Sequence, residues 1–565
     1  MSHTSSPAPH PAAPGPASTY PAAPAAAPAG TPTAATPTAT ASPEERHRLI
    51  LQALVGLLLG MFVSMIANTV VSTSLPVIVH DIGGTQNTYT WVVTAMLLTT
   101  AIFTPVWGKF ADLFPRKLLF QLAIVLFVAA TVAAGFAQDP TWLIVCRAIQ
   151  GIGGGGIFAL SQVIMADLIS PRERGRYMGL FGAVMAVATM GGPLLGGIIT
   201  DAWGWRWNFF VSVPFALIAL VLVQRTLKLT SPPPRRVRLD YLGFALLAAG
   251  SSLFLIWMTS AGHHFAWLSP TTAWMLGSAV VAVVLFVVVE RRVSEPLVPL
   301  GLFRGRTFTL SVIASVAVGV VMFGSSVYLA QYMQLARGAT PTEAGLMTIP
   351  LMVGLLVSST VIGRLITRHG VWKPYVVGGA LSLVVGLTLM GTLQAETPFV
   401  LVTVYMVLVG AGMGATMQNL VLVVQNEARP DQMGVTSSGV AFFRSLGGTT
   451  GVAAMGAAVA ASVSGSMSSR AAQVQQALGS LGAEGRRWAA ELQSGAVPKV
   501  AAMPEPLRVI VEDIYADAIS QAFLIAAPLA LITLIAVIFL PNVELGRKNN
   551  QERLAEAQQA QGAQR

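Results

Sequence analysis

Long apolar runs separated by short polar loops dominate the chain from Leu49 onward. We count about 14 runs of roughly 20 residues, which is the length that an α-helix needs to cross the hydrocarbon core of a membrane. Their approximate centres are Gly60, Met96, Leu126, Gly153, Met185, Phe215, Ala249, Val281, Val318, Val353, Leu383, Val409, Val452 and Ile532. The pattern predicts an all-α polytopic membrane protein with about 14 transmembrane helices.

The composition supports a lipid-facing surface. The 565 residues are 54% hydrophobic and only 10% charged, whereas soluble globular chains average about 25% charged residues. The single cysteine, Cys146, lies inside an apolar run, which excludes both a disulfide framework and a cysteine metal site. The net charge of +10 is spread over short loops instead of gathering on a soluble domain, so we expect no nucleic-acid partner.

The basic residues fall on one side of the predicted membrane. The loops assigned to the cytoplasm contain Lys109, Arg116, Lys117, Arg172, Arg174, Arg176, Arg235, Arg236, Arg238, Arg291, Arg292, Arg304, Arg306, Arg364, Arg368 and Lys373. The short outer loops contain only Arg206 and Arg337. The positive-inside rule therefore predicts a multi-pass protein of the cell membrane with both termini in the cytoplasm, and an even number of helices agrees.

Three segments lack long apolar runs. Residues 1–45 are rich in Pro, Ala, Ser and Thr and predict a disordered cytoplasmic tail without a secretory signal. Residues 546–565 predict a second cytoplasmic tail. The outer loop 462–515 is long and polar, and we favour a solvated spacer there. Its Ala/Gln/Glu/Arg-rich part is also compatible with an amphipathic helix on the membrane or over the mouth of a transport path.

A short motif occurs twice in the chain. Gly108-Lys-Phe-Ala-Asp112, followed by Arg116 and Lys117, lies between two predicted helices of the first half. A related pattern, Gly363-Arg-Leu-Ile-Thr367, recurs in the second half. Many transporters are built from two related halves that alternate access around a site near the midplane of the membrane. The repetition therefore favours a secondary transporter.

Three motifs resemble those of the major facilitator superfamily. The segment Gly108 to Lys117 resembles its signature loop, with Pro115 where that pattern usually has glycine. Arg147-Ala-Ile-Gln-Gly151 resembles its second motif, on the fourth helix. The residues that match its antiporter motif, on the fifth helix, are Gly179, Gly192, Pro193, Gly196 and Gly197, with Ala188 in place of one expected glycine.

With about 14 helices, the chain is most similar to the drug:proton antiporter subfamily whose members have 14 helices. The resemblance implies two six-helix bundles, residues 46–229 and 301–545, joined by two extra linker helices within residues 230–300. It also implies proton-coupled efflux of drugs or other amphipathic compounds. The protein would then work as a monomer among membrane lipids, with a small amphipathic substrate and protons as its partners.

Several charged residues and glycines are candidates for conformational roles. Asp112 lies at a helix end beside Arg116, so this charge pair could hold an inner gate in one state. Gly192 and Gly196 offer a face for close helix packing and an outer seal. Arg147 and Arg444 are the only cations well inside apolar runs, where charges normally face a bundle interior. Arg444 is closer to the inner end of its helix and could instead snorkel to the surface.

No acidic residue lies near the middle of an apolar run. The related subfamily usually carries an aspartate on the first helix, where this chain has Ala67 with Asn68 beside it. None of the 24 Asp and Glu residues replaces it at that depth. If transport is coupled to protons, the coupling group must lie near a helix end, and the candidates are Asp112 and Glu427.

Polar side chains within apolar runs are candidates for substrate contacts, because amides provide adaptable donors and acceptors. They are Asn68, Gln162, Tyr328, Gln331, Gln334, Gln418 and Asn419. The chain contains neither a Gly-x-x-x-x-Gly-Lys-[Ser/Thr] loop nor a His-Glu-x-x-His motif. We therefore expect no enzyme, no metal and no cofactor, with the proton gradient as the energy source.

Two further functions stay open from the sequence. The protein could export or flip lipid-like or neutral metabolites, which the missing central acid and the long outer loop would suit. It could also be a transporter-like sensor or scaffold that binds a ligand without net transport.

Overall fold

The computed structural model describes residues 43–83, 86–227, 229, 240–261, 265–293, 296–493, 500 and 503–563. The chain divides into two units, Met1–Arg46 and His47–Arg565, and the arrangement given below is that of the second. Most of the predicted disordered tail, residues 1–42, lies outside the described residues, as do residues 230–239 of the predicted linker.

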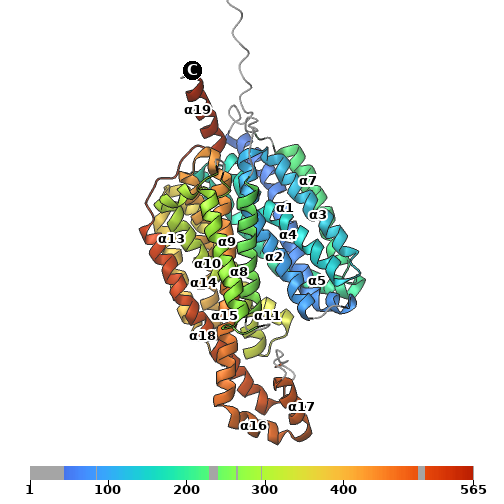
Figure 1. Ribbon diagram of the computed structural model, residues 1–565. Helices are drawn as coiled ribbons and strands as arrows, with labels where there is room; N and C mark the ends of the chain where they lie inside the picture. The colour runs from blue at the N-terminus through green and yellow to red at the C-terminus, as the bar shows by residue number, and fades with distance from the viewer. Residues whose placement is uncertain are drawn as a thin grey trace, which may run out of the picture. The chain divides into compact units, whose positions relative to one another are not determined.

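Helices form every regular element of the described part (Figure 1). In chain order they are α1 (Pro43–Asp81), α2 (Gln86–Leu113), α3 (Arg116–Gly135), α4 (Pro140–Leu168), α5 (Pro171–Trp203), α6 (Trp207–Phe210), α7 (Ser212–Thr226), α8 (Tyr241–Ser260), α9 (Pro270–Glu290), η1 (Leu300–Arg304), α10 (Arg306–Gln331), η2 (Tyr332–Ala336), α11 (Pro341–Met347), α12 (Ile349–His369), α13 (Lys373–Met390), α14 (Phe399–Glu427), η3 (Pro430–Gln432), α15 (Met433–Ser469), α16 (Ala471–Ser480), α17 (Gly482–Gln493), α18 (Glu505–Phe539) and α19 (Asn550–Ala563).

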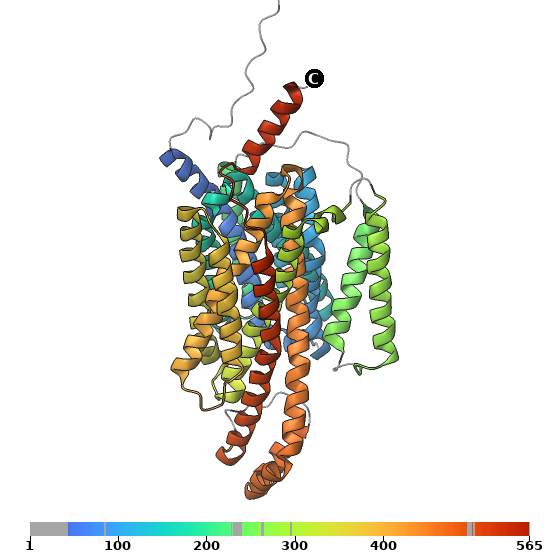
Figure 2. The same cartoon turned by 90° about the vertical axis from the view of Figure 1, so that its left-hand side faces the viewer.

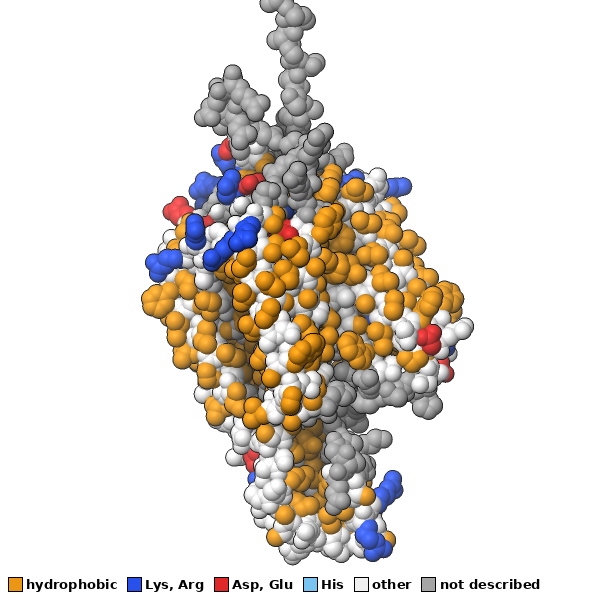
Figure 3. Space-filling model, viewed as in Figure 1, with side chains coloured by type: hydrophobic (Ala, Val, Ile, Leu, Met, Phe, Trp, Pro, Cys, Tyr) orange, Lys and Arg blue, Asp and Glu red, His pale blue; other side chains and the backbone are white. Residues whose placement is uncertain are grey.

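Within the described residues, 13 helical segments are long and apolar enough to cross a membrane. The remaining predicted span is α5, whose apolar stretch is shorter and covers Leu180–Thr189. Large apolar side chains lie exposed along the flanks of these helices, including Leu118, Val281 and Ile538. Figure 3 shows this apolar surface as a broad band. Such a surface requires lipid as its solvent, which confirms the all-α polytopic membrane fold.

The helices pack mainly in two sets that follow the chain order, and α2 and α5 also pack against α15 and α12 of the second set. In the first set α4 packs against α2 and α3, and in the second α14 packs against α12 and α13 while α10 packs against α15. We call α1–α7 the first half and α10–α18 the second half. Each half has its own large apolar core. The pair α8 and α9 lies to one side of the bundle (Figure 2).

Glycines let the helices of each half approach closely. A Cβ atom at Gly151 of α4 would lie 2.3 Å from the carbonyl oxygen of Met96 in α2. At Gly410 of α14 it would lie 2.0 Å from the carbonyl oxygen of Leu351 in α12. Gly155, Gly414, Gly447 and Gly451 face backbone atoms of neighbouring helices in the same way. These pairs at four-residue spacing serve helix packing, as their pattern predicts.

The segment 462–515 is not a solvated spacer. α15 and α18 extend into it, and α16 and α17 join them to form a hairpin (Figures 1 and 2). A small apolar core, made of Leu335, Ala477, Trp488, Val500, Met503, Leu507 and Val511, holds this hairpin together. Arg470 of α15 pairs with Asp517 of α18 at 2.7 Å. The spacer interpretation was wrong because apolar residues at helical spacing give this polar segment a face to bury.

The two ends of the bundle differ in charge. Most of the Lys and Arg side chains in Figure 3 gather at the end from which α19 leaves. We call this the basic end, and its cations include Lys109, Arg116, Arg172, Arg304, Arg306, Arg364, Arg368, Arg429 and Lys548. We call the end that carries α16 and α17 the hairpin end.

Candidate functional site

A carboxylate of the first half binds a helix N-terminus of the second half at the basic end. The side chain of Asp112, on α2, is only 4% exposed. Its two oxygens accept hydrogen bonds from the backbone N–H groups of Gly434 at 2.7 Å and Val435 at 2.9 Å. These N–H groups belong to the first turn of α15, where no helical carbonyl is available to them. A negative charge is also stabilised there by the helix dipole, so Asp112 joins the halves.

Two glycines allow this contact. A Cβ atom at Gly108 of α2 would lie 1.8 Å from Oγ of Ser438, and one at Gly434 of α15 would lie 2.1 Å from the carbonyl oxygen of Gly108. Real atoms do not approach so closely, and hence α2 and α15 meet only because both positions lack side chains. The signature-loop glycine is therefore part of the contact between halves.

Arg116 lies between two carboxylates. Its guanidinium is 3.6 Å from Asp112 and also forms a buried ion pair with Asp167 at the end of α4. It donates a further hydrogen bond to the carbonyl of Ala111 at 2.9 Å. Lys117 instead donates to the carbonyl of Gln224 in α7 at 2.7 Å, away from the second half. Sequence reasoning placed Asp167 at a helix end but missed that it is the second partner of Arg116.

Amide side chains form a second contact between the halves, where α4 meets α14. Nε2 of Gln162 donates to Oε1 of Gln418 at 3.2 Å, so the structure brings two predicted cavity residues together. Nearer the basic end, Gln425 of α14 donates to Oγ of Ser437 at 2.7 Å and accepts a hydrogen bond from Arg174 of α5. The sequence analysis predicted no contact between the halves for Arg174 or Gln425. A Gln side chain near the end of an apolar run is the sequence signal that could have indicated this contact.

The C-terminal segment forms a third contact at the same end. Nδ2 of Asn550, in α19, donates to the buried Asp167 of α4 at 2.9 Å. Arg553 donates to the carbonyl of Ala428, after α14, at 2.9 Å. The backbone N–H of Arg172 in α5 donates to the carbonyl of Gly546 at 3.2 Å. The start of the predicted tail 546–565 therefore binds both halves.

Arg147 is buried within the first half and well provided with acceptors. It is 1% exposed. Its guanidinium donates to Oδ1 of Asn68 on α1 at 3.0 Å, to the carbonyl of Val92 on α2 at 3.3 Å, and to Oε1 of Gln150 at 3.2 Å. Arg147 thus ties three helices together without a carboxylate, and the predicted cavity residue Asn68 is one of its partners.

Arg444 is also buried, at 3% exposed, but has fewer acceptors. Its Nη1 donates to the carbonyl of Met417 on α14 at 3.4 Å, and its guanidinium carbon lies 5.8 Å from the ring centre of Phe158 on α4. The burial predicted for Arg444 is confirmed, and the alternative that it snorkels to the surface is excluded because the side chain points to these two helices. It lies 11 residues from the start of α15, which is about 16 Å along the helix.

The antiporter-motif residues lie on α5. A Cβ atom at Gly192 would be 1.9 Å from Oγ1 of Thr69, and one at Gly196 would be 2.7 Å from the carbonyl oxygen of Val70, so both positions pack against α1. Gly197 faces open space, with no atom within 4 Å of such a Cβ. The side-chain surroundings of Gly179 and Pro193 lie outside the described part of the chain.

The remaining candidates do not join these clusters. Tyr328 donates to the carbonyl of Val452 at 2.6 Å, and Gln331 and Gln334 lie half-buried at the far end of α10 and in η2. Asn419, next to Gln418, donates to the carbonyl of Ala415 in its own helix at 2.7 Å. Glu427 is exposed at the end of α14, so it lacks the burial that made it a candidate for proton coupling.

Comparison with known proteins gives the family. The profile of the Major Facilitator Superfamily matches residues 57–452. An uncharacterised MFS-type transporter of Mycobacterium tuberculosis is 34% identical over 508 residues, which cover 88% of this chain and 70% of the relative. The multidrug transporter protein MdtP of Bacillus subtilis is 33% identical over 407 residues, which cover 72% of this chain and 74% of that protein. The efflux pump dotC of Dothistroma septosporum is 30% identical over 502 residues, which cover 88% of this chain and 84% of that protein.

Solved structures share the fold at low identity. The proton:xylose symporter XylE superposes with a TM-score of 0.55 at 14% identity, covering 90% of this chain and 99% of that one. The human organic anion transporter MFSD10 superposes with a TM-score of 0.53 at 15% identity, covering 87% and 100%. The family match spans most of the membrane helices, including both sides of the contact between Asp112 and Gly434. The chain therefore belongs to the major facilitator superfamily.

Proposed function

We propose that this protein is a secondary active transporter that exports amphipathic small molecules from the cell in exchange for protons. The family consists of membrane transporters, which gives the general activity. Relatives at 30–34% identity are named as multidrug transporters and efflux pumps, which favours export of drugs, antibiotics or similar compounds. The sequence contains no Gly-x-x-x-x-Gly-Lys-[Ser/Thr] loop, which favours a gradient of an ion or another solute as the energy source.

The observation that carries the proposal is the set of contacts between halves at the basic end. Asp112 caps α15, Gln162 binds Gln418, and Asn550 binds Asp167. Each contact joins groups that a relative movement of the halves would separate. Alternating access requires such a closed end that can open as a unit, because the substrate site must face one side of the membrane at a time.

The excess of Lys and Arg supports a cytoplasmic location of the basic end, because the positive-inside rule assigns such loops to the cytoplasm. Both termini would then be cytoplasmic, since α1 begins and α19 ends on that side, and the hairpin would lie outside the cell. In this orientation the described state is closed toward the cytoplasm. It corresponds to the stage at which an exporter releases its substrate outward.

Proton coupling is assigned to Asp112. Its carboxylate is buried, bonds two N–H groups of α15, and is close to Arg116. Protonation would remove the charge that the helix N-terminus stabilises and would weaken the contact between halves. Binding of a proton could therefore favour opening of the cytoplasmic end. Glu427 is the weaker candidate, because its exposed carboxylate touches no contact between the halves.

Transport by purified protein in liposomes tests the proposal. A fluorescent amphiphile should accumulate against its gradient when a pH gradient is imposed, and an uncoupler should abolish this accumulation. Counterflow of labelled substrate without any gradient separates a carrier from a sensor or scaffold, because a protein that only binds gives no counterflow. Accumulation that persists after the uncoupler would reject proton coupling but not transport.

A further inference from the structure

Arg444 lies where the two halves meet. Its own helix, α15, and the carbonyl acceptor at Met417 belong to the second half, whereas Phe158 belongs to α4 of the first half. On α4, Phe158 is one turn farther from the basic end than Gln162, and on α14 Met417 directly precedes Gln418. The guanidinium is therefore just on the hairpin side of the contact between Gln162 and Gln418.

The positive charge of Arg444 is poorly compensated compared with that of Arg147. Arg147 has three acceptor oxygens within 3.3 Å. Arg444 has one carbonyl at 3.4 Å, and no carboxylate among the described residues forms an ion pair with it. A charge within a membrane protein is costly unless it has a partner, and such charges commonly mark a substrate or ion pathway.

The groups around Arg444 favour an anion with an apolar body. Nε2 of Gln162 bonds Gln418 through one N–H, so its second N–H is a donor that an anion can use without breaking this contact. The ring of Phe158 provides an apolar face, with its centre 5.8 Å from the guanidinium carbon. Acidic residues lie only near helix ends, so a cationic substrate would meet no opposite charge at this depth.

We propose that Arg444 binds the carboxylate or sulfonate of an anionic amphiphile, so that the transporter prefers anionic over cationic substrates. This inference rests on the proposed function and names its substrate class. Arg444 would hold the anion between the halves, with the bond between Gln162 and Gln418 closing the path toward the basic end. Binding would supply the partner that the guanidinium lacks.

Matched ligands of different charge test the proposal. We choose naphthaleneacetate, its uncharged methyl ester and naphthylethylamine, and measure binding to the full-length protein in lipid nanodiscs by equilibrium dialysis. Wild type should bind the acid at least about tenfold more tightly than the ester or the amine, since a charged hydrogen bond is stronger than a neutral one. Arg444→Gln should remove this preference and leave binding of the ester unchanged. Arg444→Lys should keep an intermediate preference.

A matched control removes a different positive charge. Arg429→Gln alters an arginine at the basic end whose side chain is 74% exposed, and it should leave the preference for the acid intact. Unchanged binding of the ester shows that a variant is folded. Equal binding of all three ligands by wild type, absence of binding of the acid, or a preference that survives in Arg444→Gln would each overturn the anion site. Counterflow of amphiphiles without charge preference would reject the anion site at Arg444 but would still support the proposed transport.

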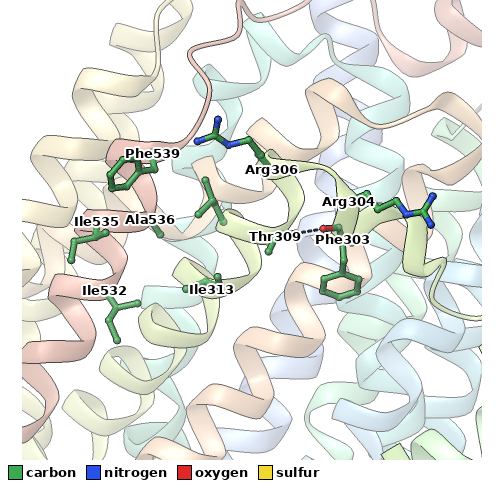
Figure 4. A pocket seen from close by; sticks show the side chains of 10 residues that line it. Phe303, Arg304, Arg306, Thr309, Ile313, Ile532, Ile535, Ala536 and Phe539 are labelled. Atoms are coloured by element: carbon green, nitrogen blue, oxygen red, sulfur yellow. Dashed lines mark hydrogen bonds between the residues drawn. The ribbon is translucent and has the colours of Figure 1, made fainter. Parts of the chain in front are cut away.

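A second, independent observation is a groove at the basic end between α10 and α18, with a volume of about 430 Å³. Figure 4 shows Arg306 and Phe539 at one end of the groove and Ile313 and Ile532 at the other. The isoleucines and Phe539 are exposed, so they face the lipid region. Arg304 also lines the groove, and neither arginine forms an ion pair within the described part of the chain.

We infer that this groove binds one anionic phospholipid of the cytoplasmic leaflet. The phosphate would lie at Arg306, with Arg304 as a second positive charge on the same rim, and an acyl chain would follow Ile313, Ile532 and Phe539. Basic pockets between transmembrane helices on the cytoplasmic side are suited to acidic headgroups, and the apolar lining is suited to a lipid tail. The inference uses the proposed orientation of the basic end but not the proposed substrate.

Native mass spectrometry of protein released from nanodiscs of phosphatidylglycerol and phosphatidylethanolamine tests this site. The double variant Arg304→Gln/Arg306→Gln should lose about one retained phosphatidylglycerol per protein, because one headgroup site is removed. Ile535→Trp should have the same effect by filling the groove without changing charge. The control Arg364→Gln/Arg368→Gln removes two exposed charges of α12 at the same end and should change nothing. Equal retention in all variants, or equal binding of both lipids by wild type, would overturn the site.

Discussion

The two ends of the bundle are held together by different kinds of contact. At the basic end, polar groups from the two halves bond to each other, as Asp112 does to Gly434 and Arg174 to Gln425. At the hairpin end, α16, α17 and α18 share an apolar core, and Arg470, between α15 and α16, forms an ion pair with Asp517 of α18. Polar contacts between halves exchange partners at little cost, whereas a packed core does not. The polar contacts therefore suit the opening of the basic end that we propose, and the packed core suits a hairpin that stays intact.

The largest expected effect comes from blocking closure of the basic end. Gly108→Leu places a side chain against Ser438 and the backbone of α15. Such overpacking costs about 1–3 kcal/mol, so the closed state should become about fivefold to 150-fold less populated and transport should nearly cease. Transport by the variant in liposomes measures the effect at matched protein content.

The control for this prediction is Gly197→Leu, because a Cβ atom at that position meets no atom within 4 Å. It should transport as wild type does. Gly192→Leu, which meets Thr69 at 1.9 Å, should fail in the manner of Gly108→Leu if α5 and α1 must stay close. Wild-type transport by Gly108→Leu would show that the contact of α2 with α15 is dispensable.

Asp112→Asn should have the next largest effect. The amide keeps one acceptor oxygen for α15 but loses the charge that faces the helix N-terminus and Arg116. We expect a loss of about 1–2 kcal/mol from the closed state, measured as faster labelling of cysteines placed along the cytoplasmic path. Efflux should also become less dependent on an imposed pH gradient. If efflux by Asp112→Asn depends on the imposed pH gradient as wild type does, Asp112 is rejected as the proton site. The same measurement on Glu427→Gln would then test the other candidate.

A smaller effect is expected from the C-terminal segment. Asn550→Ala removes the hydrogen bond to Asp167, which is worth about 1 kcal/mol. The population of the closed state should fall a few-fold. The rates of cysteine labelling along the cytoplasmic path would show this change. The matched control is Gln559→Ala, an exposed position on the same helix. If both variants label at the wild-type rate, α19 contributes nothing to closure.

The orientation of the two ends can be tested without any change in activity. On a Cys146→Ser background, a cysteine at Gln559 should react only with reagents that enter the cell, and one at Ser480 should react from outside. Both positions are exposed. The reverse pattern would place the basic end outside and would refute the positive-inside assignment used here.

The sequence predicted the membrane helices well because lipid imposes a length and a polarity on each span, and both are local properties. It also predicted the close packing at Gly192 and Gly196, which lie against α1. It failed at residues 462–515, where a polar composition concealed a small core around Trp488. The burial of a few apolar residues decides the fold of this segment, and the average polarity of the segment does not reveal which residues are buried.

The sequence by itself determined the all-α membrane fold, the family motifs and the two arginines within apolar runs. Only the tertiary structure decided the partners of these groups. Asp112 bonds a backbone N–H that lies 322 positions away, Arg116 shares Asp167 with Asn550, and Arg444 lacks the acceptors that Arg147 has. The physical reason is that periodicity and spacing constrain each helix alone. Contacts between the halves depend instead on how the helices pack, which no local pattern contains.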